Sequence, residues 1–483
     1  MKRFARMISL ILSALLPVAL PMPCATAANS LNPFEAGTLL CERFRIPAIL
    51  KLQDGSVIAA ADLRWNHGTD APQNLDIATA VSPDGYGNWV YSVPNRLEDY
   101  ADGSGSTKSA AFIDSALLQS ESGRVFLLSD LFLSGTGYPN AQKGSGCLTV
   151  NGKQFIALTK TGMEDYRFYI GQFSHDFAPV MENEQPTAYS VDRDYYLYKN
   201  GVPCVIEQKG NDDEPTGKAV MQSVFFEESD LHVFPTPFLC LRFSDDGGRT
   251  WNAPVLLNPM VKKDSEAFLG VCPGRGISIH KEGKERLIFP VYSNENHREH
   301  ALTVYSDDGG ITWRRGEDVR RSLLLGKTSE SQIIELPDGT LRMFSRNKSH
   351  FIGSCDSTDG GVSWSKAKPV LKLFGTKNCM VSFINTSKTI DKKPVVLCSM
   401  GSNFWKRANG VICVGTIEKN NRIRWINTFA LEKGFFAYSC LTELSDGNFA
   451  LLYEDEAAHL NYRIFTLHSD GTLTLDSTET SSQ

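Results

Sequence analysis

The stretch Ser244-Asp245-Asp246-Gly247-Gly248-Arg249-Thr250-Trp251 carries the pattern Ser-x-Asp-x-Gly-x-x-Trp, and this pattern recurs along the chain. The same spacing returns at Ser306–Trp313 and at Ser357–Trp364. A further stretch, Ser82–Trp89, keeps the serine, the aspartate and the tryptophan. Three complete copies and one partial copy indicate a repeated supersecondary unit, so the chain is predicted to have a repeat architecture.

The composition of this box is that of a tight turn between two strands. Glycine tolerates the positive φ that hairpin turns require, and an aspartate side chain can accept hydrogen bonds from the backbone of its own turn. The tryptophan can fold back over the end of the hairpin. The boxes are therefore predicted to be structural rather than catalytic, and their number indicates repeated β-sheets.

The remaining sequence also favours β-structure. Short apolar or β-branched runs, each bounded by Gly, Asp, Asn or Pro, occupy residues 56–63, 124–134, 394–400, 411–417 and 449–455. Long segments with a 3.6-residue hydrophobic period are absent. Because radial repetition of short sheets leaves few free strand edges, the sequence predicts an all-β, closed β-propeller.

The spacing of the boxes predicts an insertion. Ser244 and Ser306 are 62 residues apart and Ser306 and Ser357 are 51 apart, whereas Ser82 and Ser244 are 162 apart. One ordinary repeat leaves roughly 100 residues of that interval unexplained. The tyrosine-rich segment 144–222 has Asn-Gly turn signals of its own and is predicted to be a small β-rich subdomain. Two roles stay open for it, packing against the propeller rim and shaping the entrance of a site.

The N-terminus has the pattern of a secretory signal. Three basic residues within the first six positions precede a largely apolar stretch, 7–20, of 14 residues, which is too short to span a bilayer. Ala25-Thr26-Ala27 offers a cleavage site. We therefore expect a signal peptide over 1–27 and an exported chain, periplasmic or secreted, whose residues 28–483 form the propeller.

Charge and cysteine usage exclude several function classes. Removing the three basic leader residues changes the formal charge from −6 to −9, and an acidic chain without a basic stretch is a poor nucleic-acid binder. No later segment has 18 uninterrupted apolar residues, so no membrane span is predicted. Ten cysteines remain without any C-x-x-C pair, so a zinc site is not expected, and their pairing stays open.

Phe44-Arg45-Ile46-Pro47, together with the repeated boxes, resembles the bacterial exo-α-sialidases (neuraminidases). The resemblance covers nearly all of residues 28–483, and the inserted segment is similar to that of the larger bacterial sialidases. It implies an all-β, six-bladed β-propeller and the release of terminal α-linked sialic acid from glycoproteins, glycolipids or oligosaccharides with retention of configuration. Sialylated glycans are then the expected partners, and no metal or organic cofactor is implied.

The family holds the substrate carboxylate with three arginines from distant blades. Guanidinium groups suit this task because they are permanently charged and can bind a carboxylate through two parallel hydrogen bonds. By resemblance, the matching residues are Arg45, Arg346 in Ser345-Arg346-Asn347, and Arg407 in Arg407-Ala408-Asn409-Gly410.

The resemblance also implies a tyrosine nucleophile, Tyr438, in Ala437-Tyr438-Ser439-Cys440. Sialidases are exceptions to the two-carboxylate rule of glycosidases. A neutral phenol avoids the repulsion that an anionic nucleophile would meet at a carbon bearing a carboxylate. Free tyrosine ionises only near about pH 10, so it needs a base, and Glu330 matches the family's glutamate.

Asp70, in the Gly- and Pro-flanked loop 66–73, is predicted to be the acid. A carboxyl on such a loop can protonate the leaving glycosidic oxygen and then act as the base on water. Asp76 is the competing candidate, and it is less favoured because it opens the apolar run 77–81.

Four further residues are carried over from the family's pattern. Glu454 matches the acidic partner that holds the first arginine, and a buried arginine without such a partner would be costly. Arg64 and Asp130 resemble positions that contact the O4 and N-acetyl side of the sugar. Tyr292 is a candidate for the glycerol side. A purely structural role remains the alternative for Arg64, Asp130 and Tyr292.

Two alternative functions stay open. In some related sialidases the sugar's own O7 attacks the intermediate and gives an anhydro sugar, with an aromatic wall that twists the substrate. The segment 455–462 has no tryptophan, which favours hydrolysis, although Trp405 or an aromatic residue of the insertion could serve. A sialic-acid-binding propeller without turnover is the second alternative, and the presence of Asp70, Glu330 and Tyr438 argues against it.

Overall fold

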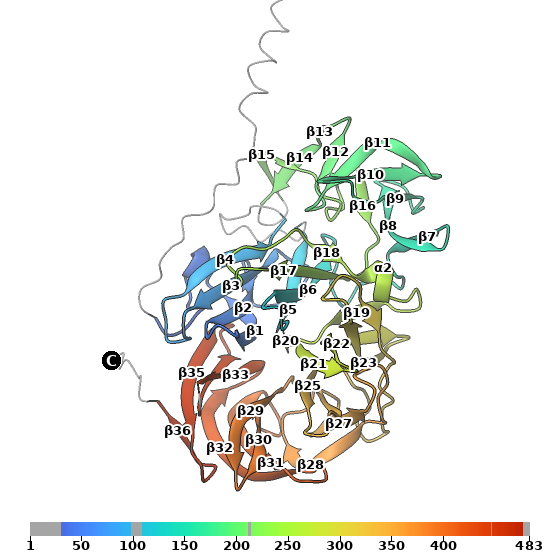
Figure 1. The fold of residues 1–483 in the computed structure, drawn as a ribbon. Coiled ribbons are helices and arrows are strands. Elements are labelled where there is room, and N and C mark those ends of the chain that lie inside the picture. The colour runs from blue at the N-terminus through green and yellow to red at the C-terminus, as the bar shows by residue number, and fades with distance from the viewer. Residues whose placement is uncertain (1–29, 98–108, 211–213, 446, 477–483) are drawn as a thin grey trace, which may run out of the picture.

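The chain folds into short antiparallel strands that surround a common centre in a propeller-like arrangement (Figure 1). This computed structural model describes residues 30–97, 109–210, 214–445 and 447–476, so the predicted signal peptide, 1–27, lies outside the described residues. Helical structure in these ranges is confined to η1 (Thr38–Leu40) and α2 (Asn258–Val261). Neither is long and apolar enough to cross a membrane.

The first sheet has nine strands, and its two halves meet through one parallel pairing, between Leu75 and Ala111. Its strands are β1 (Phe44–Lys51), β2 (Val57–Arg64), β3 (Leu75–Ser82), β4 (Val90–Asn95), β5 (Ala111–Gln119), β6 (Val125–Phe132), β17 (Phe238–Ser244), β18 (Val255–Leu256) and β20 (Gly274–Arg275). Strands β2 and β3 are buried along their whole length, which suits their many alanines.

Four smaller sheets complete the ring. The five-stranded sheet contains β19 (Phe268–Val271), β21 (Ile277–Lys281), β22 (Lys284–Glu295), β23 (Arg298–Ser306) and β24 (Arg314–Arg315). Three four-stranded sheets follow: β25 (Ser331–Glu335), β26 (Leu341–Ser345), β27 (Phe351–Ser357) and β28 (Lys368–Phe374); β29 (Ser382–Ile390), β30 (Lys393–Gly401), β31 (Ala408–Ile417) and β32 (Ile423–Phe435); β33 (Ser439–Ser445), β34 (Asn448–Glu454), β35 (Leu460–Leu467) and β36 (Leu473–Leu475).

Between β6 and β17 the chain forms two separate sheets, which lie beyond the outer edge of the propeller strands at the top of Figure 1. They contain β7 (Cys147–Val150), β8 (Lys153–Lys160), β9 (Phe168–Ile170), β10 (Phe177–Glu182), β11 (Gln185–Asp192), β12 (Leu197–Lys199), β13 (Val202–Pro203), β14 (Val205–Lys209), β15 (Pro215–Met221) and β16 (Leu231–Val233). Strand β16 pairs with β8 although it follows residue 222. The boundaries 144–222 stay a prediction.

Each Ser-x-Asp box joins two neighbouring strands, β3 to β4, β17 to β18, β23 to β24 and β27 to β28. In the second box Ser244 Oγ donates to Asp246 Oδ1 at 2.7 Å, and the Gly248 N–H donates to Ser244 Oγ at 2.8 Å. Gly248 has a φ of 90°, which its lack of a side chain permits. Burial raises the pKa of Asp246, but hydrogen bonds from Thr250 and Ser244 outweigh it and lower the pKa below its ordinary value. These bonds support the structural role predicted for the boxes.

The ring closes where the first strand meets the last sheet. Strand β1 lies against β33 and β34. The Lys51 N–H donates to Thr442 Oγ1 at 3.0 Å, and the Ile49 N–H donates to Cys440 Sγ at 3.4 Å. One apolar cluster combines side chains of β1, β2 and β3 with those of β33, β34 and β35. This closure brings Arg45, at the start of the described chain, beside Tyr438, near its end.

Candidate active site

A pocket of about 610 Å³ lies where loops from all the propeller sheets converge. Eight of the ten predicted site residues line it: Arg45, Asp70, Asp130, Tyr292, Glu330, Arg346, Arg407 and Tyr438. The other two, Arg64 and Glu454, are fully buried behind its wall. The fold thus gathers residues that are almost 400 positions apart in the sequence, from 45 to 438.

Tyr438, Glu330 and Arg346 form a closed triangle of polar contacts. Tyr438 Oη donates to Glu330 Oε1 at 2.6 Å, and Arg346 Nη1 donates to Tyr438 Oη at 2.7 Å. Arg346 Nη1 also pairs with Glu330 Oε2 at 2.5 Å. The backbone sets this arrangement, because the Arg346 N–H donates to the Glu330 carbonyl at 2.8 Å just beyond the paired strands β25 and β26.

The phenol of Tyr438 is held neutral by its surroundings. Burial raises its pKa well above the ordinary value, and although the Arg346 charge lowers the pKa, the negative Glu330 raises it further. A phenol in this state becomes a nucleophile only if its proton is removed as it attacks. Glu330 Oε1 already accepts the hydrogen bond from the Tyr438 hydroxyl. Glu330 is therefore positioned to be the base.

A β-bulge aims Arg45 into the pocket. The pairing of β1 with β2 shifts register between Arg45 and Ala48, and Ile46 takes a φ of 57°, which is rare for a β-branched residue. The Ile46 N–H leaves the ladder and donates to Glu454 Oε1 at 2.8 Å. Arg45 binds the same carboxylate through Nε at 3.2 Å and Nη2 at 3.4 Å. Glu454 therefore fixes both the bulge and the guanidinium.

Replacing Glu454 by glutamine is expected to lower the free energy of unfolding by about 3 kcal/mol, because the largely buried Arg45 charge loses its buried carboxylate partner and keeps only the exposed Asp70. Urea unfolding followed by tryptophan fluorescence measures this. The matched control is Glu228→Gln on the exposed pair of Glu228 with Lys209, 3.9 Å apart, where a change near zero is expected. Equal stability changes in the two variants would contradict the role assigned to Glu454.

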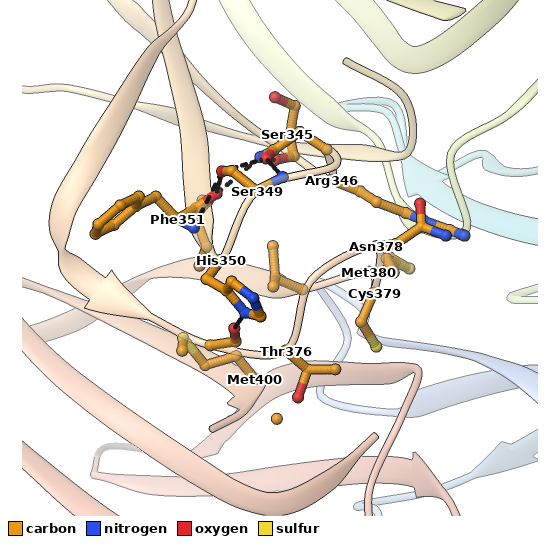
Figure 2. A pocket seen from close by; sticks show the side chains of 15 residues that line it. Ser345, Arg346, Ser349, His350, Phe351, Thr376, Asn378, Cys379, Met380 and Met400 are labelled. Carbon is orange, nitrogen blue, oxygen red and sulfur yellow. Dashed lines mark hydrogen bonds between the residues drawn. The ribbon is translucent and has the colours of Figure 1, made fainter. Parts of the chain in front are cut away.

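Arg346 and Arg407 approach the same side of the pocket. Arg407 Nη2 donates to the Asn378 carbonyl at 3.3 Å, and Arg346 Nε donates to Asn378 Oδ1 at 3.3 Å. Figure 2 shows Arg346 reaching toward Asn378 beside a small cavity of about 20 Å³. The Arg407 guanidinium lies 5.4 Å from the centre of the Tyr438 ring. With Arg45, these residues place three permanent positive charges around the phenol.

Asp70 is presented to the pocket by two arginines. Arg64 Nη1 donates to its Oδ1 at 2.8 Å and Arg45 Nη1 at 3.2 Å, while 65% of the side chain stays exposed. Burial raises the pKa of Asp70, but the charges of Arg64 and Arg45 outweigh it and lower the pKa below its usual range. The competing Asp76 is buried away from the pocket, where it accepts a hydrogen bond from Trp65 Nε1 at 2.8 Å.

A group of buried carboxylates lies beneath Asp70. Arg64, predicted to contact the sugar, is fully buried with Nη2 on Asp62 Oδ2 at 2.7 Å, so the structure places it as a support for Asp70. Asp130 Oδ1 accepts the Val271 N–H at 3.0 Å. Asp114 also lines the pocket, although no motif in the sequence predicts it. Burial and the charges of Asp62 and Asp130 raise the pKa of Asp114 well above its usual range.

Aromatic residues form another part of the pocket wall. The ring of Tyr292 lies 4.9 Å from that of Phe268, which lies 4.9 Å from Tyr138. Glu299 Oε2 pairs with Lys327 Nζ at 2.7 Å on the same wall. Among these, only Tyr292 was predicted, because the others belong to no pattern in the sequence. No three His, Cys, Asp or Glu side chains within the described ranges are grouped so as to hold a metal ion.

Several known proteins are similar to this chain in sequence and in fold. A family model described as a BNR repeat-like domain matches residues 200–451. The anhydrosialidase of Macrobdella decora is 33% identical over 88% of this chain and 59% of its own length. Sialidase B of Streptococcus pneumoniae is 30% identical over 88% of this chain and 64% of its own. The chain thus spans less than two thirds of these two relatives. The solved intramolecular trans-sialidase of Ruminococcus gnavus superposes with a TM-score of 0.83 at 32% identity, over 91% of this chain and 98% of that one.

Proposed function

Because this chain belongs to the bacterial sialidase family, we propose that it is an exo-α-sialidase, a glycoside hydrolase that releases terminal α-linked sialic acid with retention. Its substrates are sialylated glycoproteins, glycolipids or oligosaccharides. The observation that carries the proposal is the triangle of Tyr438, Glu330 and Arg346, in which a buried neutral phenol donates to a carboxylate at 2.6 Å. Such a pair is the arrangement that an activated nucleophile requires.

The three arginines would hold the substrate carboxylate. Arg45, Arg346 and Arg407 line one pocket and remain charged at any pH that enzymes meet. Their fixed charges suit an oxocarbenium-like transition state that carries a carboxylate beside the reacting carbon. An Asp or Glu nucleophile would meet repulsion from that carboxylate, whereas the phenol of Tyr438 does not.

The reaction proceeds in two displacements. Tyr438 Oη attacks the anomeric carbon while Glu330 takes its proton, and the glycosidic bond breaks as Asp70 gives its proton to the leaving oxygen. In the second displacement water attacks the same carbon, Asp70 takes a proton from the water, and the bond to Tyr438 Oη breaks. Glu330 returns the proton to the phenolate, so each group regains its starting state.

The binding of substrate would prepare Asp70 for its role. In the free protein the charges of Arg64 and Arg45 keep its pKa low, whereas an acid must hold a proton. A bound carboxylate neutralises part of the Arg45 charge, which weakens that effect and raises the pKa of Asp70 in the complex. Water exclusion by the substrate acts in the same direction.

Replacing Asp70 by asparagine is expected to lower kcat on 3′-sialyllactose by about 10²- to 10⁴-fold, since the leaving sugar alkoxide then departs without a proton. The loss on 4-nitrophenyl sialoside should be much smaller in the first displacement, because nitrophenolate needs no proton. Values of kcat/KM on the two substrates, which report only the steps through the first displacement, measure the difference. Full activity on 3′-sialyllactose would refute Asp70 as the acid.

A second candidate function is intramolecular transfer, in which a hydroxyl of the bound sugar replaces water and an anhydro sugar leaves. It is favoured by the Macrobdella decora and Ruminococcus gnavus relatives, which resemble this chain over about nine tenths of its length and are named for that reaction. Trp405, the tryptophan closest in sequence to Arg407, is 87% exposed and is not among the pocket-lining residues. The residue assignments are the same for both reactions.

Proton NMR of the products from 3′-sialyllactose separates these functions. Free α-sialic acid appearing first supports the retaining hydrolase, and an anhydro product supports intramolecular transfer. Binding without turnover would overturn both in favour of a sialic-acid-binding propeller.

The proposal extends to the architecture. The boxes join β3 to β4 and β17 to β18 within the nine-stranded sheet, which favours counting that sheet as two blades and the whole ring as six. The inserted strands interrupt the second of these blades.

The proposal also includes localisation. We propose that the chain is exported to the periplasm or to the medium, where sialylated glycans are accessible.

A further inference from the structure

Residues 135–140, called the stem segment here, lead from propeller strand β6 toward the inserted strands. The segment passes between two parts of the pocket wall. On one side it meets the loop that carries Asp70, and on the other it meets strands β22 and β23. Tyr138 and Pro139 of the segment line the pocket.

Gly137 makes the contact with the Asp70 loop. A Cβ atom on this glycine would lie 2.2 Å from the carbonyl oxygen of Ala71 and 2.5 Å from its carbon. The φ of Gly137 lies outside the left-handed region, so close approach and not backbone conformation requires the glycine. The obstructing atoms are backbone atoms of the residue that follows Asp70, and they can yield only if the loop moves.

Tyr138 anchors the segment on its other side. Its Oη donates to Glu299 Oε1 at 3.0 Å and accepts from Asn294 Nδ2 at 2.9 Å, and its ring packs edge-on against Phe268. Bonds within the segment keep it compact, since the Gly137 N–H donates to Asn140 Oδ1 at 2.8 Å. Gly137 is therefore fixed relative to β22 and β23, and not merely to the Asp70 loop.

We propose that the stem segment is a brace that positions the Asp70 loop for proton transfer to the leaving group. The loop orders itself internally, with Gln73 Nε2 donating to the His67 carbonyl at 3.1 Å, but that bond does not place the loop over the pocket. Arg64 and Arg45 hold the Asp70 carboxylate itself, and the close contact between the backbones of Gly137 and Ala71 supports the loop at the next residue. The inference rests on the proposed function, because it assumes that Asp70 is the acid. Gly137 and Tyr138 act through Asp70 and are positioning residues.

Gly137→Ala is expected to push the loop outward and lower kcat on 3′-sialyllactose by about 10-fold or more, since acid catalysis depends on placement within a fraction of an ångström. On 4-nitrophenyl sialoside, whose leaving group needs no proton, kcat/KM reports only the steps through the first displacement and should stay within about twofold. Tyr138→Phe removes the anchoring hydroxyl and should give the same selectivity with a smaller loss. A variant that overpacks a part of the protein away from the Asp70 loop would lower the rates on both substrates by the same factor.

The matched control is Gly316→Ala. A Cβ atom there would lie 2.6 Å from Thr303 Oγ1 and 2.7 Å from the Gly361 carbonyl oxygen, away from the pocket. This variant should lose thermal stability, and its ratio of rates on the two substrates should equal that of the unaltered protein.

Three results decide the inference. Selective loss on 3′-sialyllactose in Gly137→Ala or Tyr138→Phe supports the brace, and equal loss on both substrates overturns it. If Gly137→Ala does not fold, Tyr138→Phe decides alone. If Asp70→Asn itself shows no selectivity between the substrates, the proposed acid is wrong, and this failure is distinct from failure of the brace.

Discussion

Replacing Tyr438 by phenylalanine is expected to lower kcat/KM on 3′-sialyllactose by about 10³-fold or more, because the covalent route through the phenolic oxygen is lost. The phenyl ring fills the same space, and the pair of Arg346 with Glu330, 2.5 Å apart in the unaltered protein, does not depend on the hydroxyl. Substrate binding should therefore persist. Steady-state rates, together with binding measured by calorimetry, test the two halves of this expectation.

Tyr462→Phe provides the matched control for that variant. Tyr462 is a buried tyrosine in strand β35 whose Oη donates to the Gly85 carbonyl at 2.8 Å, outside the pocket. Its removal should cost about 1 kcal/mol of stability and leave the rate unchanged. If Tyr438→Phe kept the rate of the unaltered protein, the nucleophile would have to be another group.

Replacing Glu330 by glutamine is the second change with a large expected effect, a fall in kcat of about 10²- to 10⁴-fold. The amide oxygen can still accept the hydrogen bond from Tyr438 Oη, but it cannot take the proton. Burial raises the pKa of that phenol well above its ordinary value, so spontaneous ionisation cannot replace the base at neutral pH. KM should change less than kcat, and rates across a range of substrate concentrations separate the two.

The control for this change lies on the adjoining strand. Glu335 ends β25, the strand that begins directly after Glu330, and it does not line the pocket. Glu335→Gln alters the same kind of side chain without reaching the reacting atoms. Loss of activity in Glu335→Gln equal to that in Glu330→Gln would show a general effect of the substitution rather than loss of a base.

The sequence predicted those parts of the fold that local chemistry determines. The run at 56–63 is confirmed as β2 and the run at 449–455 as β34, each within one residue at its ends. The boxes are confirmed as turns because their hydrogen bonds are made within eight residues. The number of blades could not be obtained in this way, because the nine-stranded sheet joins two box-bearing units through a single parallel pairing.

The prediction of the site residues depends mostly on family resemblance. The reason is that irregular backbone positions, which local sequence does not predict, shape the pocket. Ile46, Asp114 and Asn409 all have positive φ and interrupt strand pairing beside pocket residues. Tertiary contacts such as the hydrogen bond from the Ile46 N–H to Glu454 stabilise these conformations. No local sequence pattern predicts such contacts. Asp114 was missed for this reason, since it lies within a mostly apolar strand, Ala111–Gln119, and matches no motif.

The central claim is that Tyr438 forms a covalent bond to the sugar. A sialosyl fluoride with a second fluorine beside the anomeric carbon slows both displacements, and its good leaving group lets the intermediate accumulate. Peptide mass spectrometry after brief incubation and acid quenching then locates the adduct. The account predicts a sialyl group on the peptide that contains Tyr438, and none in Tyr438→Phe. An adduct on Glu330 or Asp70, or turnover of the fluoride without any adduct, would contradict it.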